Sequence, residues 1–191
     1  MTTGAHQQAP LSFEEYLRFE QMTDVRHEYV GGQVFAMTGG SVRHGQMSAL
    51  IAALLLQGFE ARGCRVQSHD TKLRVPLGAT YYPDVFVSCG PPADTHFDDD
   101  ATWVVEVLSD STRDKDEREK SVAYLRLPSI RGYLLVETSS RTIQLRTAAE
   151  VGWHITWYHD GDVLDLDGIQ IKVADLYDRL DRLAPPATTI A

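Results

Sequence analysis

Two acidic residues stand in apolar surroundings and could share a divalent cation. Asp84 follows Pro83 at the start of an apolar segment, and proline belongs at a strand start because it cannot donate to a sheet ladder. Glu106 is the single charged residue within residues 102–108, where an unpaired buried carboxylate would be costly. Hard oxygen ligands of this kind suit Mg²⁺. If the two segments are neighbouring strands, Asp84 and Glu106 are predicted to form a metal site.

Each of these carboxylates also has a purely structural interpretation. Asp84 could be a turn aspartate that begins a strand, and Glu106 could belong to a buried salt bridge. The separation of 22 residues between them leaves room for one intervening connection between two adjacent strands.

A lysine that could serve such a site lies further along the chain. Residues 110–127 form a strongly charged segment with helical spacing, and Pro128 is expected to end it. We expect Val122 and Leu125 to form its apolar stripe, with Tyr124 beside them. Lys120 lies close to this stripe and could project toward the carboxylates, or it could be a surface lysine whose stem covers apolar neighbours.

These motifs, taken in order, resemble a known family. The motifs are Tyr-Pro-Asp at 82–84, Val-Val-Glu-Val-Leu-Ser at 104–109 and Lys-x-x-x-Tyr at 120–124. They are similar to those of the Uma family of restriction-endonuclease-like proteins, within the PD-(D/E)xK nuclease superfamily. His-Glu-Tyr-Val-Gly-Gly at 27–32 and Gly-Tyr-Leu-Leu-Val-Glu at 132–137 also match its layout. The resemblance extends over residues 12–180.

The resemblance implies a divalent-metal nuclease in which Asp84 and Glu106 supply the acidic residues of the two motifs. The chain departs from the superfamily pattern at Leu108, which occupies the position of the usual lysine. An apolar side chain cannot polarise water or offset charge on a phosphate, so the lysine must come from elsewhere if the site is active. Lys120 is our candidate, and Lys72, on the strand before Asp84, is the alternative.

Three further residues are candidates for supporting roles. The family layout suggests that Glu28 lines the site, although it could instead be a strand-edge glutamate paired with Arg26 or Arg43. His44 matches a histidine of that layout, and its alternative is a helix-surface or interface histidine. Tyr124 belongs to the Lys-x-x-x-Tyr motif. By contrast, the charged loop at residues 96–100 is interpreted as a solvated charge run.

The hydrophobic pattern predicts helices and strands in a mixed order. A capping box at Ser12 and Glu15 predicts a first helix, and Gly31-Gly32 predicts a hairpin between residues 27–30 and 33–37. Gly63 is expected to end the longest helix, residues 41–62. The Asp160-Gly161 pair is expected to be a hairpin turn. Strands are predicted at residues 65–69, 72–77, 82–88, 102–108, 132–137, 142–147, 153–159 and 169–173, and a closing helix at residues 174–183.

This order predicts an α/β (α+β) protein with a restriction-endonuclease-like mixed β-sheet core flanked by helices. We expect an N-terminal β-hairpin and additional C-terminal antiparallel strands. Residues 12–183 are predicted to form a single domain, between a disordered leader at 1–11 and a flexible tail at 184–191.

Composition and charge narrow the class of protein. The net charge of −9 argues against a protein that coats nucleic acid nonspecifically, which should be basic. The longest strongly apolar run, residues 49–56, is far shorter than a membrane span. Cys64 and Cys89 have neither a CxxC nor a zinc spacing, so we expect reduced thiols and a cytoplasmic location.

The resulting hypothesis is a Mg²⁺- or Mn²⁺-dependent endonuclease that hydrolyses DNA. A homodimer is expected because symmetric cleavage favours two-fold pairing, with the aromatic strands at residues 142–159 as its interface. The alternatives are a catalytically inactive nuclease-fold module that binds nucleic acid or protein, and a metal phosphoesterase for small molecules.

Overall fold

The centre of the protein is a six-stranded mixed sheet. The structure, a computed structural model, describes residues 10–184. The strand order is β11-β10-β9-β8-β6-β3, in which β8 (Ala101–Val107) pairs antiparallel with β6 (Val85–Ser88) and parallel with β9 (Gly132–Val136). The outer strands are β3 (Arg65–Ser68) on one side, and β10 (Thr142–Ala148) and β11 (Trp153–His159) on the other.

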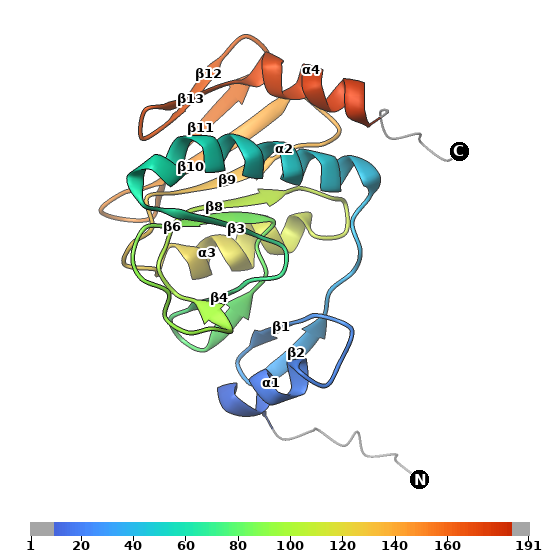
Figure 1. Cartoon of the computed structure of the whole chain (residues 1–191), viewed down its shortest axis with the longest axis vertical. Coiled ribbons are helices and arrows are strands. Elements are labelled where there is room, and N and C mark those ends of the chain that lie inside the picture. Colours follow the sequence, from blue (N-terminus) through green and yellow to red (C-terminus); the bar gives the residue numbers. More distant parts are fainter. Residues whose placement is uncertain (1–9, 185–191) are drawn as a thin grey trace.

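Alternation along β8 assigns its residues to two different cores. Trp103, Val105 and Val107 face α2 (Val42–Phe59) and α4 (Val173–Leu183), while Val104 and Leu108 face the core that contains Tyr124. Successive residues of a strand point to opposite faces, so Glu106 belongs to the second face. Figure 1 shows α2 lying across the strands.

A smaller sheet packs beside this core and completes the fold. Its order is β2-β1-β5-β4-β7, and α1 (Phe13–Glu20) lies next to the hairpin of β1 and β2 (Figure 1). Its strands are β1 (His27–Val30), β2 (Gln33–Ala36), β4 (Lys72–Val75), β5 (Ala79–Tyr81) and β7 (Phe97–Asp98). The α+β architecture with flanking helices, an N-terminal hairpin and C-terminal antiparallel strands is confirmed.

Three local predictions, a helix cap and two glycine turns, are confirmed by the backbone geometry. Ser12 and Glu15 form the reciprocal capping box at the start of α1. Gly31 and Gly32 both have positive φ in the two-residue turn between β1 and β2. α2 continues into the short 3₁₀ turn η1 (Glu60–Arg62), and Gly63 follows it in the left-handed conformation, with φ of 74°.

The charged helix differs from its prediction in position and phase. It consists of a π-helical turn, η2 (Lys115–Lys120), followed by α3 (Ser121–Tyr124). Val122, predicted to lie in the apolar stripe, is 58% exposed, and the inward residues are Asp116, Lys120 and Tyr124. These three residues are each four apart and so share one helix face, which differs in phase from the predicted stripe of Val122 and Leu125.

The C-terminal strands also correct the prediction. Asp160 and Gly161 lie between β11 and β12 (Val163–Leu166), which do not pair with each other. The hairpin joins β12 to β13 (Ile169–Lys172) through Asp167 and Gly168, both with positive φ. The short strands β5, β7 and β12 were not predicted separately.

The two cysteines form a disulfide, so the prediction of free thiols was wrong. Cys64 precedes β3 and Cys89 follows β6, and the antiparallel register pairs Arg65 with Ser88. The cysteines therefore occupy the next opposing positions of that ladder, a closeness set by strand register rather than by sequence spacing. The cytoplasmic location rested partly on reduced thiols and stays a prediction.

The ends of the described chain are bonded to the fold. Leu11 donates its backbone N–H to the carbonyl of Gly32, and the buried Ala184 accepts a hydrogen bond from Arg43. Otherwise the predicted leader and tail lie outside the described residues, at 1–9 and 185–191. Between residues 10 and 184, no helix has both the length and the apolar character needed to cross a membrane.

Candidate active site

A pocket of about 240 Å³ lies where the hairpin, the start of α2, the β6–β8 pair and η2 meet. Its wall contains several groups that could do chemistry, including the four carboxylates Glu28, Asp84, Glu106 and Asp116 and the two amines Lys115 and Lys120. Strands and a helix supply these groups from positions far apart in the chain.

Strand register brings Asp84 and Glu106 together. Val85 of β6 pairs with Val105 of β8, so the residues one step beyond them, Asp84 and Glu106, also lie opposite each other. The Oδ2 atom of Asp84 accepts a hydrogen bond of 2.7 Å from the backbone N–H of Val107. This bond holds the Asp84 carboxylate against the end of β8 that carries Glu106.

Lys120 enters the same pocket from η2. Its buried Nζ atom lies 2.9 Å from Oε1 of Glu106, 3.0 Å from Oδ1 of Asp116 and 3.2 Å from Oε1 of Glu28. Tyr124, one turn further along, donates its hydroxyl to the same Oε1 of Glu106 at 2.9 Å. Both bonds to Glu106 use Oε1, and no hydrogen bond to its Oε2 is present within residues 10–184.

Neither Lys72 nor Leu108 takes part in the polar contacts of Asp84 and Glu106. The Nζ atom of Lys72 sits 5.2 Å from the centre of the Tyr82 ring, and Lys72 does not line the pocket. Leu108 is buried in the apolar core beside Tyr124. Of the two candidate lysines, the fold therefore places only Lys120 next to Glu106.

Glu28 and His44 also lie in the pocket wall. Glu28 pairs with Lys115 and Lys120, rather than with Arg26 or Arg43 as its structural alternative supposed. The Nε2 atom of His44, in the first turns of α2, lies 3.2 Å from Oδ2 of Asp84. This contact with Asp84 outweighs partial burial and raises the pKa of His44 above its ordinary value.

Three residues of the site were not identified from the sequence. Asp116 and Lys115 belong to the charged segment in which the sequence singled out only Lys120 and Tyr124 as site residues, but Asp116 is 1% exposed and both line the pocket. Their signal was present, because Asp116 stands four residues before Lys120, a spacing at which helical side chains meet. His69 lies with its Nδ1 atom 3.7 Å from Oδ1 of Asp84, and nothing in its local sequence indicated this.

The site carries more negative than positive formal charge. Four carboxylates face two ammonium groups, an excess of two negative charges when His44 is neutral. Burial raises the pKa of Glu106 well above its ordinary value, and the nearby charges of Asp116 and Asp84 raise it further against the opposing effect of Lys120. Burial also raises the pKa of Asp116. The three carboxylates around Lys120 outweigh its burial and raise the pKa of the amine.

These residues fit a hard divalent cation. Mg²⁺ commonly uses one or two carboxylates together with water and substrate phosphate, and Asp84 and Glu106 can provide two. The excess negative charge and the Oε2 atom of Glu106 favour a cation at this position. Within residues 10–184, no three acidic, histidine or cysteine side chains converge as a complete ligand set, so a cation here would rely on water or substrate for its other ligands.

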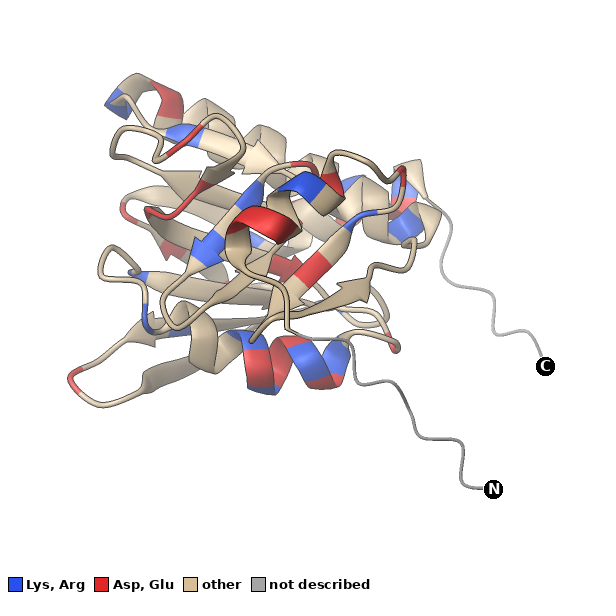
Figure 2. Ribbon diagram, turned by 90° about the horizontal axis from the view of Figure 1, so that it is seen from below, with Lys and Arg blue, Asp and Glu red and all other residues tan. Residues whose placement is uncertain are grey.

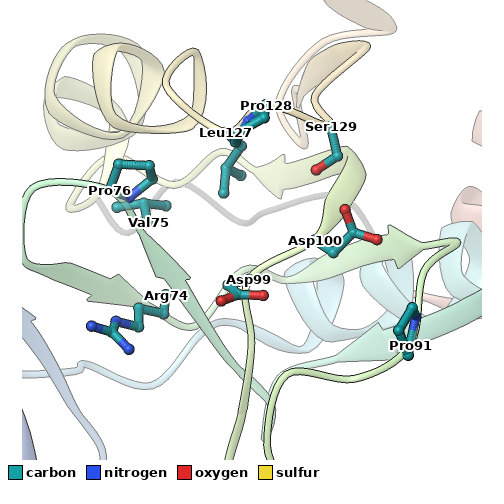
Figure 3. Close-up of a pocket in the computed structure, with 9 residues that line it drawn as sticks. All are labelled: Arg74, Val75, Pro76, Pro91, Asp99, Asp100, Leu127, Pro128 and Ser129. Carbon is teal, nitrogen blue, oxygen red and sulfur yellow. The ribbon is translucent and has the colours of Figure 1, made fainter.

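A larger cavity elsewhere lacks these features. It has a volume of about 540 Å³ and is walled in part by Pro76, Pro91 and Pro128 (Figure 3). Two of its polar side chains are engaged in structural bonds: Asp100 accepts the N–H of Gly90, and Ser129 donates to the carbonyl of Ala101. We therefore place the candidate site at the smaller, charged pocket.

Comparison with known proteins places the chain in a family. The sequence profile described as "Uma2: Putative restriction endonuclease" matches residues 13–176. The chain belongs to this Uma2 family. All the carboxylates and amines of the pocket lie inside the matched range.

Two relatives and one solved structure are also similar to this chain. The chain is 36% identical over 168 residues to the uncharacterized protein slr1290 of Synechocystis sp., with 86% of this chain and 88% of that protein covered. It is 27% identical over 132 residues to sll1609 of the same organism, covering 66% and 75% of the two chains. A crystal structure described as a putative nuclease belonging to DUF820, from Anabaena variabilis, superposes with a TM-score of 0.73 at 13% identity, over 90% of this chain and 99% of that chain. At that identity the superposition demonstrates a shared fold.

Proposed function

We propose that this Uma2 protein is a divalent-metal-dependent endonuclease that hydrolyses phosphodiester bonds in DNA. The observation that supports this most strongly is the meeting of Asp84, Glu106 and Lys120 in one pocket, from two paired strands and a helix. The family description, a restriction endonuclease, names the same class of reaction.

In this proposal Asp84 and Glu106 hold Mg²⁺ or Mn²⁺. A bound divalent cation lowers the pKa of water and stabilises charge on phosphoryl oxygens. Val107 fixes the orientation of Asp84 through its backbone N–H, while Tyr124 and Lys120 fix Oε1 of Glu106. These bonds hold both carboxylates in place, so they could bind a cation without a cost of reorganisation at each turnover.

Lys120 supplies the positive charge that the superfamily usually places at the position of Leu108. Its ammonium group is fixed beside Glu106, where it would orient the attacking water or offset developing negative charge. Lys115 is less buried, with 30% of its side chain exposed, and lies in the same wall. It is therefore the amine better placed to meet an incoming phosphate.

A cleavage assay with matched variants tests this function. Asp84→Asn and Glu106→Gln should each abolish Mn²⁺-dependent nicking of plasmid DNA, because each removes a ligand charge while keeping side-chain size. Asp99→Asn, an equal charge change in the larger cavity, should leave cleavage at the wild-type rate. Cleavage by Asp84→Asn at the wild-type rate would rule the mechanism out.

A catalytically inactive binding module is the second candidate, favoured by Leu108 and by the enclosure of Lys120 among three carboxylates. Calorimetry separates the two, since an inactive module should show no Mn²⁺ binding that Glu106→Gln removes. Hydrolysis of small phosphodiesters but not of DNA would instead identify a small-molecule phosphoesterase.

A further inference from the structure

The outermost strand of the six-stranded sheet, β11, has an open edge. All seven of its residues pair with β10 in one continuous register, from Thr142 opposite His159 to Ala148 opposite Trp153. No strand of the described chain pairs with its other side. Such an edge presents a row of backbone donors and acceptors to any strand that can approach it.

The pairing pattern identifies which backbone groups point outward. Thr142 accepts from Glu137, and Ala148 donates to Arg131, so even-numbered residues of β10 direct their backbone toward β9. Adjacent residues of an antiparallel strand bond to opposite sides. Odd-numbered residues of β10 therefore bond β11, and in β11 the outward backbone groups belong to residues 153, 155, 157 and 159. Those of His159 bond Asp162, which leaves residues 153–157 as the accessible stretch.

The side chains along this edge do not obstruct pairing. Ile155 is 48% exposed and Trp157 is 52% exposed, and both lie on one face of the strand. β11 contains no proline, acidic residue, lysine or arginine, the features by which edge strands usually avoid association. At the other edge, β3 is shorter and begins with Arg65, which pairs with Asp98.

We propose that β11 pairs antiparallel with β11 of a second copy, about a two-fold axis at Thr156. In this register Ile155 of each copy lies opposite Trp157 of the other, and the outward backbone groups of both residues bond across the interface. Thr156 lies opposite Thr156 of the second copy in a pair without mutual backbone bonds. The inference rests on the sheet edge and does not depend on the proposed nuclease activity.

The composition of the strand favours a second copy of this chain as the partner. A two-fold interface must be self-complementary, and apolar Ile155 against apolar Trp157 satisfies this condition on both sides of the axis. Cross-strand pairs between aromatic and β-branched residues are favourable. Although the chain has a net charge of −9, no charged side chain of β11 would oppose its own copy.

A charge introduced at the edge tests the interface. Sedimentation equilibrium should show that the wild-type protein is a dimer. Ile155→Lys should raise the dissociation constant of this dimer by about tenfold or more. Val151→Lys adds the same charge at an apolar residue that is 93% exposed in the preceding turn, and it should leave the dimer unchanged. A monomeric wild-type protein overturns the proposal, even if β11 then binds a strand of another protein. Equal weakening of the dimer by both substitutions also overturns it.

A cross-linking test fixes the register. Opposed residues in a pair without mutual backbone bonds have Cα atoms about 4.5 Å apart, which is within disulfide range. Thr156→Cys should therefore cross-link to its own copy under mild oxidation. His154→Cys should not, because its copies would be separated by four residue steps, about 13 Å. Comparable cross-linking of the two variants overturns the proposed axis.

Discussion

Lys120 illustrates how one buried residue can hold a charged site together. Its ammonium group contacts Glu28, Glu106 and Asp116, and Tyr124 completes the bonding of Glu106. Burial of such a cluster costs desolvation energy, which the close contacts and hydrogen bonds must offset. Loss of the Lys120 ammonium group would leave these three carboxylates facing one another.

We expect Lys120→Met to lower the free energy of unfolding by about 3–5 kcal/mol, the range measured when one partner of a buried ion pair is removed. Lys115→Met is the matched control and should cost clearly less, because its side chain is 30% exposed and water can compensate part of the loss. Urea unfolding at neutral pH measures both. Equal losses for the two variants would contradict the central role of Lys120.

At the level of elements, the site depends on the junction of β6 and β8. β6 begins directly after Asp84, and β3 on its other side leads to His69. The disulfide joins the opposite end of the β3–β6 pair, so it holds the short edge strand in register from the far side.

Reduction of this disulfide should lower the free energy of unfolding by about 3.5 kcal/mol, the loop-entropy value for a closed loop of this length. The two cysteines are 25 residues apart in the chain. Guanidinium unfolding with and without dithiothreitol measures the difference in unfolding free energy. A Cys64→Ser/Cys89→Ser protein should have the unfolding free energy of the reduced wild type, with or without reductant. An unfolding free energy of the wild type that does not change with reductant would refute the expectation.

The charged helix presents three polar side chains to the interior of the protein. Asp116, Lys120 and Tyr124 are each four residues apart, so they share one face of the helix, and all three are buried. Tyr133 donates to the carbonyl of Asp116, and Arg146 donates to that of Glu117. The neighbouring strands β9 and β10 thus bind backbone groups of this helix and hold it against the sheet.

For the molecule as a whole, net charge limits how DNA can bind. Acidic and basic segments are interspersed along the ribbon in Figure 2, and the chain carries nine net negative charges. DNA is itself a polyanion, and nonspecific binding normally depends on phosphate neutralisation by lysine and arginine. A divalent cation between the carboxylates and a phosphate would remove the local repulsion.

The proposed function therefore predicts that DNA binding requires a divalent cation. Fluorescence anisotropy of a labelled duplex should detect an affinity at least about tenfold higher in Ca²⁺ than in EDTA, since a cation at the site reverses the local repulsion. Glu106→Gln should lose this gain. Equal binding of the wild type in Ca²⁺ and EDTA would contradict the prediction.

The sequence by itself determined the features that depend on neighbouring residues. The capping box at Ser12, the Gly31-Gly32 turn and the left-handed Gly63 were all predicted, because each satisfies backbone groups only a few residues away. The mixed α+β order followed from hydrophobic periodicity in the same way. The isolated acid in the strand of Glu106 also marked a buried group that needs a partner.

Tertiary structure alone decided which distant groups meet. The register of β6 against β8 places Asp84 opposite Glu106, and that of β3 against β6 joins Cys64 to Cys89. The phase of η2 brings Asp116 inward and exposes Val122. Register and helix phase arise from packing across the whole sheet, where a shift of one residue reverses the face that each side chain occupies. The four-residue spacing of Asp116 and Lys120 was a local signal for the helix face, but strand register joins residues far apart in the chain and has no such signal.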